Sequence, residues 1–132
     1  TGALRDKNND EQTRFSEEYY NAIRNRKSKS DIDAIAKNTG FSTIQITNIR
    51  NHIFEEIHDL GDGRIERFDT DWRIAQAWQR LEQGKYNELD SMLLHHELYE
   101  LTLMREKGYN YEEAHIEAHK KYPWGTLIKD EK

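Results

Sequence analysis

The chain has 132 residues, the length of one domain, and a domain of this size buries roughly 68% of its unfolded surface. Its apolar fraction of 35% is low and its charged fraction of 34% is high, but three Trp, seven Tyr and four Phe argue against disorder. The net charge of −5 provides no global basic field for nucleic acid, the lack of cysteine excludes disulfides, zinc ribbons and a thiol nucleophile, and no apolar run approaches the ~20 residues that span a bilayer, so we expect no stable membrane insertion.

The two ends of the chain are polar. We expect residues 1–9 to be a disordered or linker segment and residues 126–132 to be a polar tail, with a helical domain at 10–125. The chain begins at Thr1 without a methionine and shows no signal peptide, from which we expect a piece of a longer protein.

The first helical pattern begins at Asp10. Its buried stripe is expected to contain Phe15, Tyr19, Ala22 and Ile23. A short basic run follows at 24–29, and it is either a solvated helix end and linker or a patch that contacts phosphates.

Residues 32–49 match the helix-turn-helix pattern. Ser30 is expected to cap the first helix, Gly40 to occupy the turn, and Ser42 to cap the second helix. In a DNA-reading module the second helix would present five side chains to the major groove: Thr43, Gln45, Thr47, Asn48 and Arg50. The alternative is that the two helices only pack against each other through the same turn.

An isoleucine stripe continues beyond that second helix, at 46, 49, 53 and 57. It predicts one long helix that runs to Asp59, with His52 and His58 near its C-terminal end, where the helix dipole favours protonated imidazole. Residues 60–63 then break the helix, and the alternation at 64–68 predicts a short β-ribbon or an extended connector. Asp69 or Thr70 is expected to cap the next helix, which Gly84 ends.

The helix expected at 87–107 organises the rest of the chain. Glu97 lies inside its apolar stripe, and His96 and Glu100 stand four residues apart on an adjoining face. Because a buried unpaired carboxylate costs several kcal/mol, Glu97 needs a cation, a histidine or a metal as its partner. A last helix at 110–121 offers His115 and His119.

Three kinds of chemistry fit these residues. His96 and Glu97 begin the zinc-protease motif, but position 100 is Glu where that motif requires His. Histidines and carboxylates can instead hold a divalent cation for phosphodiester cleavage, and a metal-free variant uses an imidazole as general base or acid. The structural alternative is a buried Glu–His network that only specifies packing. The sequence therefore predicts an all-α fold, a compact single domain of about six helices with a helix-turn-helix-like pair.

Several spaced blocks resemble a domain found at the C-terminus of bacterial polymorphic toxins, such as contact-dependent growth inhibition effectors and related phage-associated proteins. The blocks lie at 35–42, 51–54, 58–60, 67–69, 74–81, 93–100 and 111–115. The resemblance implies a toxin exported as the tail of a larger effector and delivered to the cytoplasm of a target bacterium. It also implies a cognate immunity protein in the producing cell, and a nuclease activity on DNA or transfer RNA.

The polar positions inside these blocks are the expected site. The catalytic candidates are His96, Glu97, Glu100, His115, His58 and Asp69, and the first four are also the expected ligands of a divalent metal, Mg²⁺ or Zn²⁺. His52 is a further polar position in the blocks, whereas His95 and His119 lie outside them.

An acidic chain that binds nucleic acid would also need a local basic rim. The candidates are Arg24, Arg26, Lys27, Lys29 and Arg50. Two other functions stay open: a helix-turn-helix DNA-binding module without catalysis, and a non-enzymatic toxin or adaptor that binds a host protein.

Overall fold

The structure is a computed structural model that describes residues 10–130. The expected linker at 1–9 and residues 131–132 of the expected tail lie outside that range. The described residues are mostly helical, which confirms the all-α prediction. In chain order the elements are α1 (Asp10–Asn25), α2 (Ser30–Thr39), α3 (Thr43–Arg50), the π-helical turn η1 (Asn51–Glu55), β1 (His58–Asp59), β2 (Ile65–Glu66), α4 (Trp72–Gln83), α5 (Glu88–Glu106), α6 (Tyr111–Lys121) and α7 (Trp124–Asp130).

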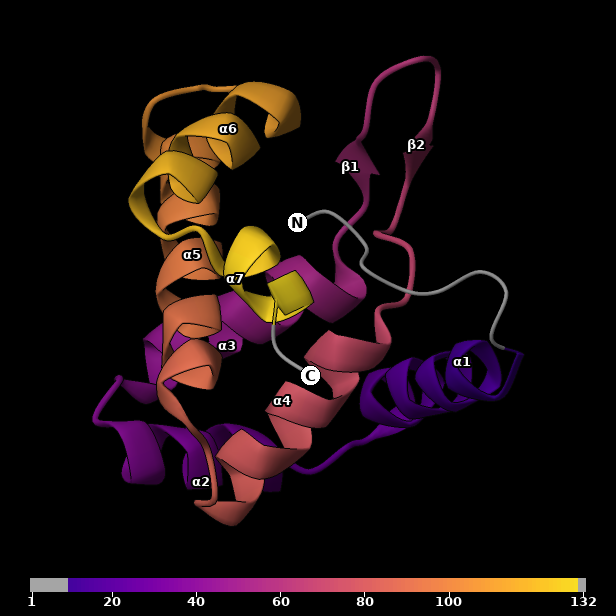
Figure 1. Ribbon diagram of the computed structural model, residues 1–132, viewed down its shortest axis with the longest axis vertical. Helices are drawn as coiled ribbons and strands as arrows, with labels where there is room; N and C mark the ends of the chain where they lie inside the picture. The colour runs from indigo at the N-terminus through magenta and orange to yellow at the C-terminus, as the bar shows by residue number, and fades with distance from the viewer. Residues whose placement is uncertain (1–9, 131–132) are drawn as a thin grey trace.

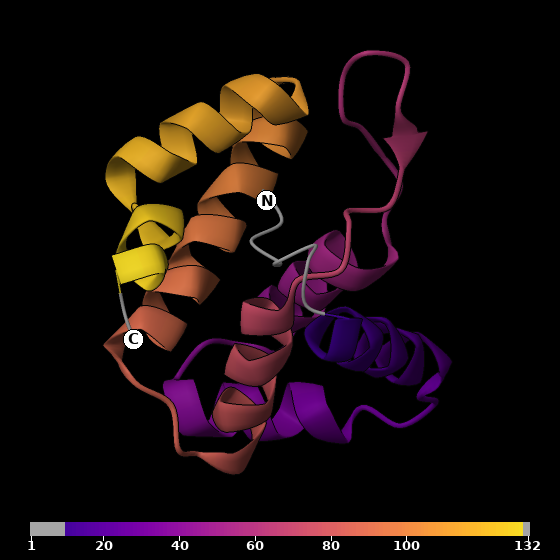
Figure 2. The same ribbon diagram turned by 45° about the vertical axis from the view of Figure 1, so that its right-hand side comes forward.

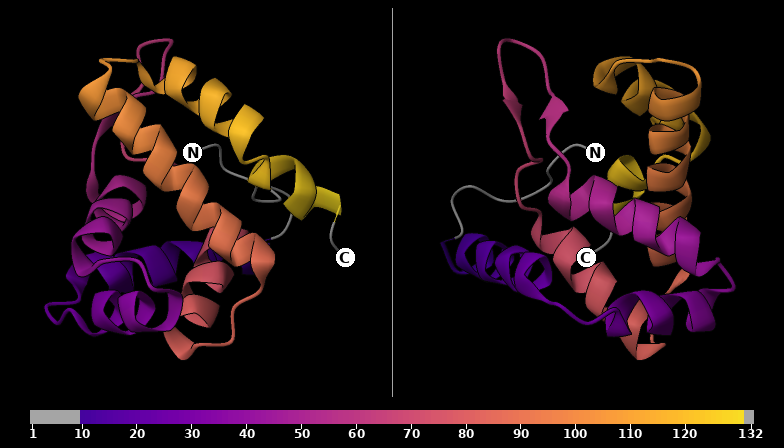
Figure 3. Two further views of the ribbon diagram at one scale, coloured as in Figure 1. Left: turned by 90° about the vertical axis from the view of Figure 1, so that its left-hand side faces the viewer. Right: turned by 180° about the vertical axis from the view of Figure 1, so that it is seen from behind.

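The fold is assembled on α5, as the sequence predicts. This helix contacts α3, η1, α4, α6 and α7, and α6 runs back along it (Figures 1 and 3). Asn87 caps its first turn by accepting a hydrogen bond from the backbone N–H of Asp90. The carboxylate of Asp90 in turn receives Nε and Nη2 of Arg80 at 2.7 and 2.8 Å, which ties α5 to α4.

The apolar core is formed by one face of each helix from α1 to α5, together with η1 and α7. Its largest fully buried side chains are Trp78, Tyr20, Phe54, Ile23, Ile35, Ile46, Ile49, Ile53, Ile74, Leu81, Leu93 and Leu94. One buried ion pair crosses this core. Nε of Arg50 lies 2.9 Å from Oδ2 of Asp31, which also accepts a hydrogen bond from Nε1 of Trp78 at 3.2 Å.

The helix-turn-helix-like pair is present as α2 and α3. Gly40 has a φ of 84°, the left-handed conformation that a residue with a side chain rarely adopts. Ser42 caps α3, and Gln45 completes a reciprocal capping box with it. Ser30 does not cap α2, because it is the first residue of the helix and Lys29 takes the cap position.

The long helix expected from 43 to 59 is wrong. It passes into the wider π-helical turn after Arg50, where the N–H of Glu56 donates to the carbonyl of Asn51, and it ends there in extended backbone. Ile57 is therefore 65% exposed and His58 lies on β1. The isoleucine spacing alone could not reveal this, because an extended residue can continue a three-and-four pattern by coincidence.

Three further expectations need correction. The buried face of α1 is formed by Ser16, Tyr20 and Ile23, so Phe15 and Ala22 are exposed. The helix cap at 69 or 70 is instead Asp71, whose Oδ1 accepts hydrogen bonds from the backbone N–H groups of residues 73 and 74. Most of the expected tail at 126–132 belongs to α7, which docks onto the core through Trp124 and Ile128.

The short β-ribbon is confirmed. β1 pairs antiparallel with β2, His58 opposite Glu66, and Figure 2 shows the ribbon extending away from the helices. Among the described helices, none has the length and apolar character needed to cross a bilayer.

Candidate metal centre

Five titratable side chains meet where α5, η1 and α6 come together. α5 contributes His96, Glu97 and Glu100, η1 contributes His52, and α6 contributes His115. The spacing on α5 explains three of the five side chains, because residues three and four apart project from the same face of a helix. The other two depend on how η1 and α6 pack against that face.

Glu100 is the centre of the cluster. Its Oε2 lies 3.2 Å from Nε2 of His96 and 2.9 Å from Nδ1 of His115, and its Oε1 lies 2.8 Å from Nε2 of His52. Oε2 of Glu97 approaches the same Nε2 of His52 at 3.6 Å. One carboxylate thus receives three imidazoles from three different elements.

The tautomer of His96 is determined by the main chain. Its Nδ1 lies 3.0 Å from the carbonyl oxygen of Tyr122, and because a carbonyl only accepts, Nδ1 carries the hydrogen. Neutral His96 therefore directs the lone pair of Nε2 toward the carboxylate of Glu100. Two like lone pairs repel, so this geometry needs either a proton or a metal cation between the two atoms.

The pKa values within the cluster are pushed apart. Burial raises the pKa of Glu97 to about 7, and the nearby charge of Glu100 adds to this. Burial would raise the pKa of Glu100 as well, but opposing contributions, among them the hydrogen bonds with its three histidines, hold it well below its usual range.

The two most buried histidines respond differently. Burial lowers the pKa of His52 to about 4, although Glu100 opposes this shift. Burial also lowers the pKa of His96, but the carboxylates of Glu100 and Glu97 outweigh burial, and the net effect is a raised pKa. Apart from any cation, His52 is therefore neutral and His96 is the imidazole that takes the proton.

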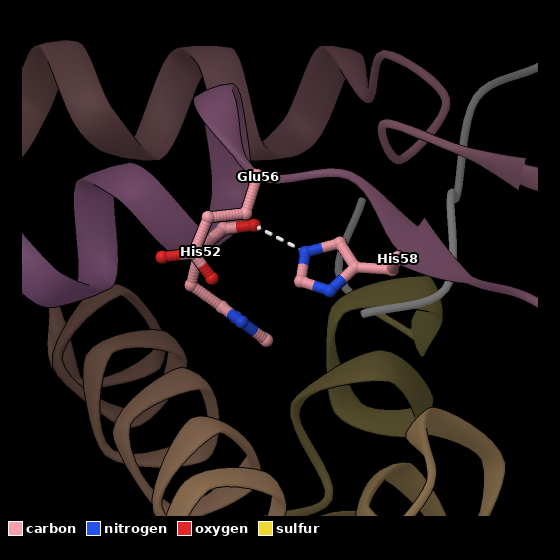
Figure 4. Close-up of side chains that lie close together, drawn as sticks. All are labelled: His52, Glu56 and His58. Atoms are coloured by element: carbon pink, nitrogen blue, oxygen red, sulfur yellow. Dashed lines mark hydrogen bonds between the residues drawn. The ribbon is translucent and has the colours of Figure 1, made fainter.

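His58 lies behind the cluster, against His52. Its Nε2–H donates to the carbonyl of His52 at 3.0 Å, as Figure 4 shows, and its ring stacks on Phe68 at 4.2 Å. Burial lowers its pKa. His58 is therefore not a helix-end histidine, whereas His52 does lie in the last turn of η1; burial lowers the pKa of both, opposite to the effect expected from the helix dipole.

The cluster reaches solvent on the α6 side. The side chain of His115 is 32% exposed, whereas those of His52, His96, Glu97 and Glu100 are 2% exposed or less. The ring of Tyr111 stacks on His115, and burial together with the charges of Glu100 and Glu97 raises the pKa of its phenol. A ligand from solvent would therefore meet His115 first.

The residues present can hold a metal ion. A tetrahedral ion with bonds of about 2.0–2.1 Å places its ligand atoms about 3.3–3.4 Å apart. The separations from Oε2 of Glu100 to His96 and His115 are close to that value, so small shifts would admit an ion. The hydrogen bond from His96 to a main-chain carbonyl is the outer contact that metal-binding histidines usually make.

The structure brings together His96, Glu97, Glu100 and His115, and it places His58 behind them. Asp69 lies apart, with a 38% exposed side chain whose Oδ1 is 3.2 Å from Nη2 of Arg64. His52 is one of the polar positions expected at the site from the sequence, but it is not among the predicted catalytic residues or metal ligands. No local sequence pattern links His52 to the cluster, because its partner Glu100 is 48 residues away.

The expected basic rim is not one surface. Arg50 is buried with Asp31, so its guanidinium is not available to phosphate, whereas Arg26 is partly exposed with its Nη1 3.3 Å from Oε1 of Glu82. Lys27 and Lys29 are exposed.

Arg24 and Arg67 lie together at a cleft that also contains the acidic side chains of Glu17, Glu66 and Asp69, so this surface has no net positive charge. Their Nε atoms donate to the carbonyls of Phe54 and Glu55, at the end of η1. Both line an open cleft of about 510 Å³, of which Phe68 is also a wall. Since Phe68 stacks on His58, this cleft lies directly behind the cluster. Arg67 was not singled out from the sequence.

No protein-family model, no curated protein and no solved structure matches the chain.

Proposed function

We propose that this domain is a metal-dependent nuclease, with His96, Glu100 and His115 holding the catalytic cation. The observation that carries the proposal is the convergence of three imidazoles on one buried carboxylate, with one of them at the surface. A nitrogen-rich ligand set of this kind suits Zn²⁺ better than Mg²⁺, which prefers oxygen.

The chain's own residues supply the remaining functions. A bound cation would neutralise charge that develops on a phosphodiester as it is cleaved. His119 lies one helical turn from His115, and burial and the charge of His115 lower its pKa, so it is a neutral imidazole suited to accept a proton. Arg24 and Arg67 would be the guanidinium groups that meet the phosphates of a longer substrate, beside the carboxylates of Glu17, Glu66 and Asp69 in the same cleft.

The resemblance to polymorphic toxin tails supports a biological setting for this chemistry. In that setting the domain is an antibacterial toxin that reaches the cytoplasm of a target bacterium as the tail of a larger effector. A cognate immunity protein would protect the producing cell by covering the exposed edge of the cluster at His115.

The test compares two adjacent histidines. His96→Ala removes a member of the cluster, and His95→Ala is its matched control, because His95 is exposed on the same helix and contacts Phe41 and Tyr122. Each protein is incubated with plasmid DNA and with total bacterial RNA, in Zn²⁺, in Mg²⁺ and in chelator. We expect cleavage of one substrate to fall at least ~100-fold in His96→Ala and in chelator, and to persist in His95→Ala.

Far-UV circular dichroism establishes whether His96→Ala is folded. Equal cleavage by a folded His96→Ala protein would remove the cluster from catalysis. Cleavage that persists in chelator would support the metal-free variant, in which an imidazole is the base. If no condition cleaves either nucleic acid, the proposal is wrong.

The α2–α3 pair supports a second candidate, a DNA-binding module without catalysis. Thr43 and Gln45 are exposed on α3, although Gln45 is engaged in the capping box and Arg50 is not available. This candidate predicts that a Gln45→Ala, Asn48→Ala double variant loses DNA binding in a gel-shift assay while His96→Ala retains it.

A further inference from the structure

We propose that Glu100 bridges two divalent cations, and that a second cation position is formed by His52, Glu97 and Oε1 of Glu100. The inference deepens the proposed function, because it rests on the first position at His96 and His115. It makes the centre dinuclear, with one carboxylate shared between two ligand sets.

The two oxygens of Glu100 have separate partners. Oε2 is paired with His96 and His115, at 3.2 and 2.9 Å, and Oε1 is paired with His52, at 2.8 Å. A carboxylate that uses one oxygen for each ion is a common bridge in two-metal sites, where the ions are about 3.5–4 Å apart. Each oxygen therefore has the partners of one metal position.

The second ligand set is complete without any residue from the first position except Glu100. Nε2 of His52 lies 2.8 Å from Oε1 of Glu100 and 3.6 Å from Oε2 of Glu97. These values bracket the ~3.4 Å spacing of ligand atoms around a tetrahedral ion. Three protein ligands are the number found in catalytic zinc sites, which leave one position for water or substrate.

Charge and burial favour a cation at this point. Glu97 and Glu100 are one turn apart on the same face of α5, and neither side chain has measurable exposure. Two ionised carboxylates in a low-dielectric interior repel each other and lose their hydration, a cost of several kcal/mol that either protonation or a cation between them can offset. A divalent ion between them would remove both penalties.

A competing position exists at His52, Glu56 and His58, whose ligand atoms also lie close together. It is the weaker one, because its groups have other partners. Nε2 of His58 donates to the carbonyl of His52, and Oε2 of Glu56 is 2.6 Å from Nη2 of Arg105. Figure 4 shows the His58 ring turned to that carbonyl.

The identity of the ions follows from the ligand set. Together the two positions contain three imidazoles and two carboxylates, a mixture that suits Zn²⁺, Mn²⁺ or Fe²⁺ and disfavours Ca²⁺ and Mg²⁺. Zn²⁺ and Mn²⁺ are the practical probes. Mn²⁺ adds a spectroscopic readout, since two ions that share a bridging ligand are magnetically coupled.

The test is metal stoichiometry of the intact chain. Protein stripped with chelator is reloaded with Zn²⁺ or Mn²⁺ and desalted, and the bound metal is counted by mass spectrometry. We expect two equivalents in the wild type, one in Glu97→Gln, and two in the control Glu56→Gln. The wild-type Mn²⁺ protein should show a spin-coupled spectrum, and Glu97→Gln the spectrum of an isolated ion.

Any of three results would overturn the bridge: one equivalent in the wild type, two in Glu97→Gln, or loss of the second ion only in Glu56→Gln. The wild-type count decides the matter even if Glu97→Gln does not fold. Failure here is distinct from failure of the nuclease proposal. One bound ion with active cleavage leaves the nuclease intact, whereas two bound ions without cleavage support the bridge and remove the nuclease.

Discussion

Replacing Asp31 with Asn tests whether Arg50 belongs to the core. Asp31 has no exposed surface, and its Oδ2 accepts hydrogen bonds from Arg50 at 2.9 Å and from Trp78 at 3.2 Å. Asn keeps the shape but removes the charge, so the guanidinium is left in the interior without its counter-ion. Breaking one side of a buried ion pair costs about 3–5 kcal/mol. That is a large share of the roughly 5–15 kcal/mol by which a domain is stable.

The assay is urea unfolding followed by circular dichroism. Asp33→Asn is the matched control, because Asp33 is exposed on the same helix, and we expect a change within about 0.5 kcal/mol. A double variant with Arg50→Met should recover part of the loss, giving a coupling energy of about 2 kcal/mol between the two positions. A loss below about 1 kcal/mol in Asp31→Asn would refute the reasoning and return Arg50 to the candidates for nucleic-acid contact.

Two further predictions concern the cluster and the C-terminal helix. The folded chain holds a proton on Glu97, because burial raises the pKa of this carboxyl to about 7. The stability that this protonation contributes to the wild type should therefore be lost as pH rises from 4.5 through 7. In chelator, the stability of Glu97→Gln relative to the wild type should therefore increase between pH 5 and pH 8, and a constant or decreasing difference in urea unfolding would contradict the shift. Trp124→Ala should cost about 3–5 kcal/mol because Trp124 is 2% exposed, whereas Leu127→Ala on the exposed side of α7 should cost much less. Equal losses for these two variants in thermal unfolding would show that α7 is not docked as described.

Local features of the fold could be predicted because their causes lie within a few residues. The caps at Ser42, Asn87 and Asn110 depend on a side chain that reaches a backbone N–H two or three positions ahead. The helix ends at Gly40 and Gly84 depend on a left-handed φ. The second strand of the ribbon and the length of α5 follow from periodicity in the same way, whereas the first strand lies where periodicity predicts a helix.

The π-helical turn η1 and the short helix α7 could not be predicted, because neither depends on the spacing of apolar residues. The π-helical turn η1 forms hydrogen bonds with the same backbone groups as an α-helix, so no residue type predicts it. α7 is only seven residues long and follows Pro123, and such a short helix is formed by docking rather than by propensity.

The same division applies to the site. The chain by itself determined that His96, Glu97 and Glu100 share a helix face, because the geometry of an α-helix puts residues three and four apart together. Only the tertiary structure decided that His52 and His115 complete the cluster, and that Arg50 is buried while Asp69 is apart. The reason is distance along the chain. Contacts between residues 15 to 48 positions apart depend on how whole helices pack, and that packing is determined by the summed burial of the core rather than by any local pattern.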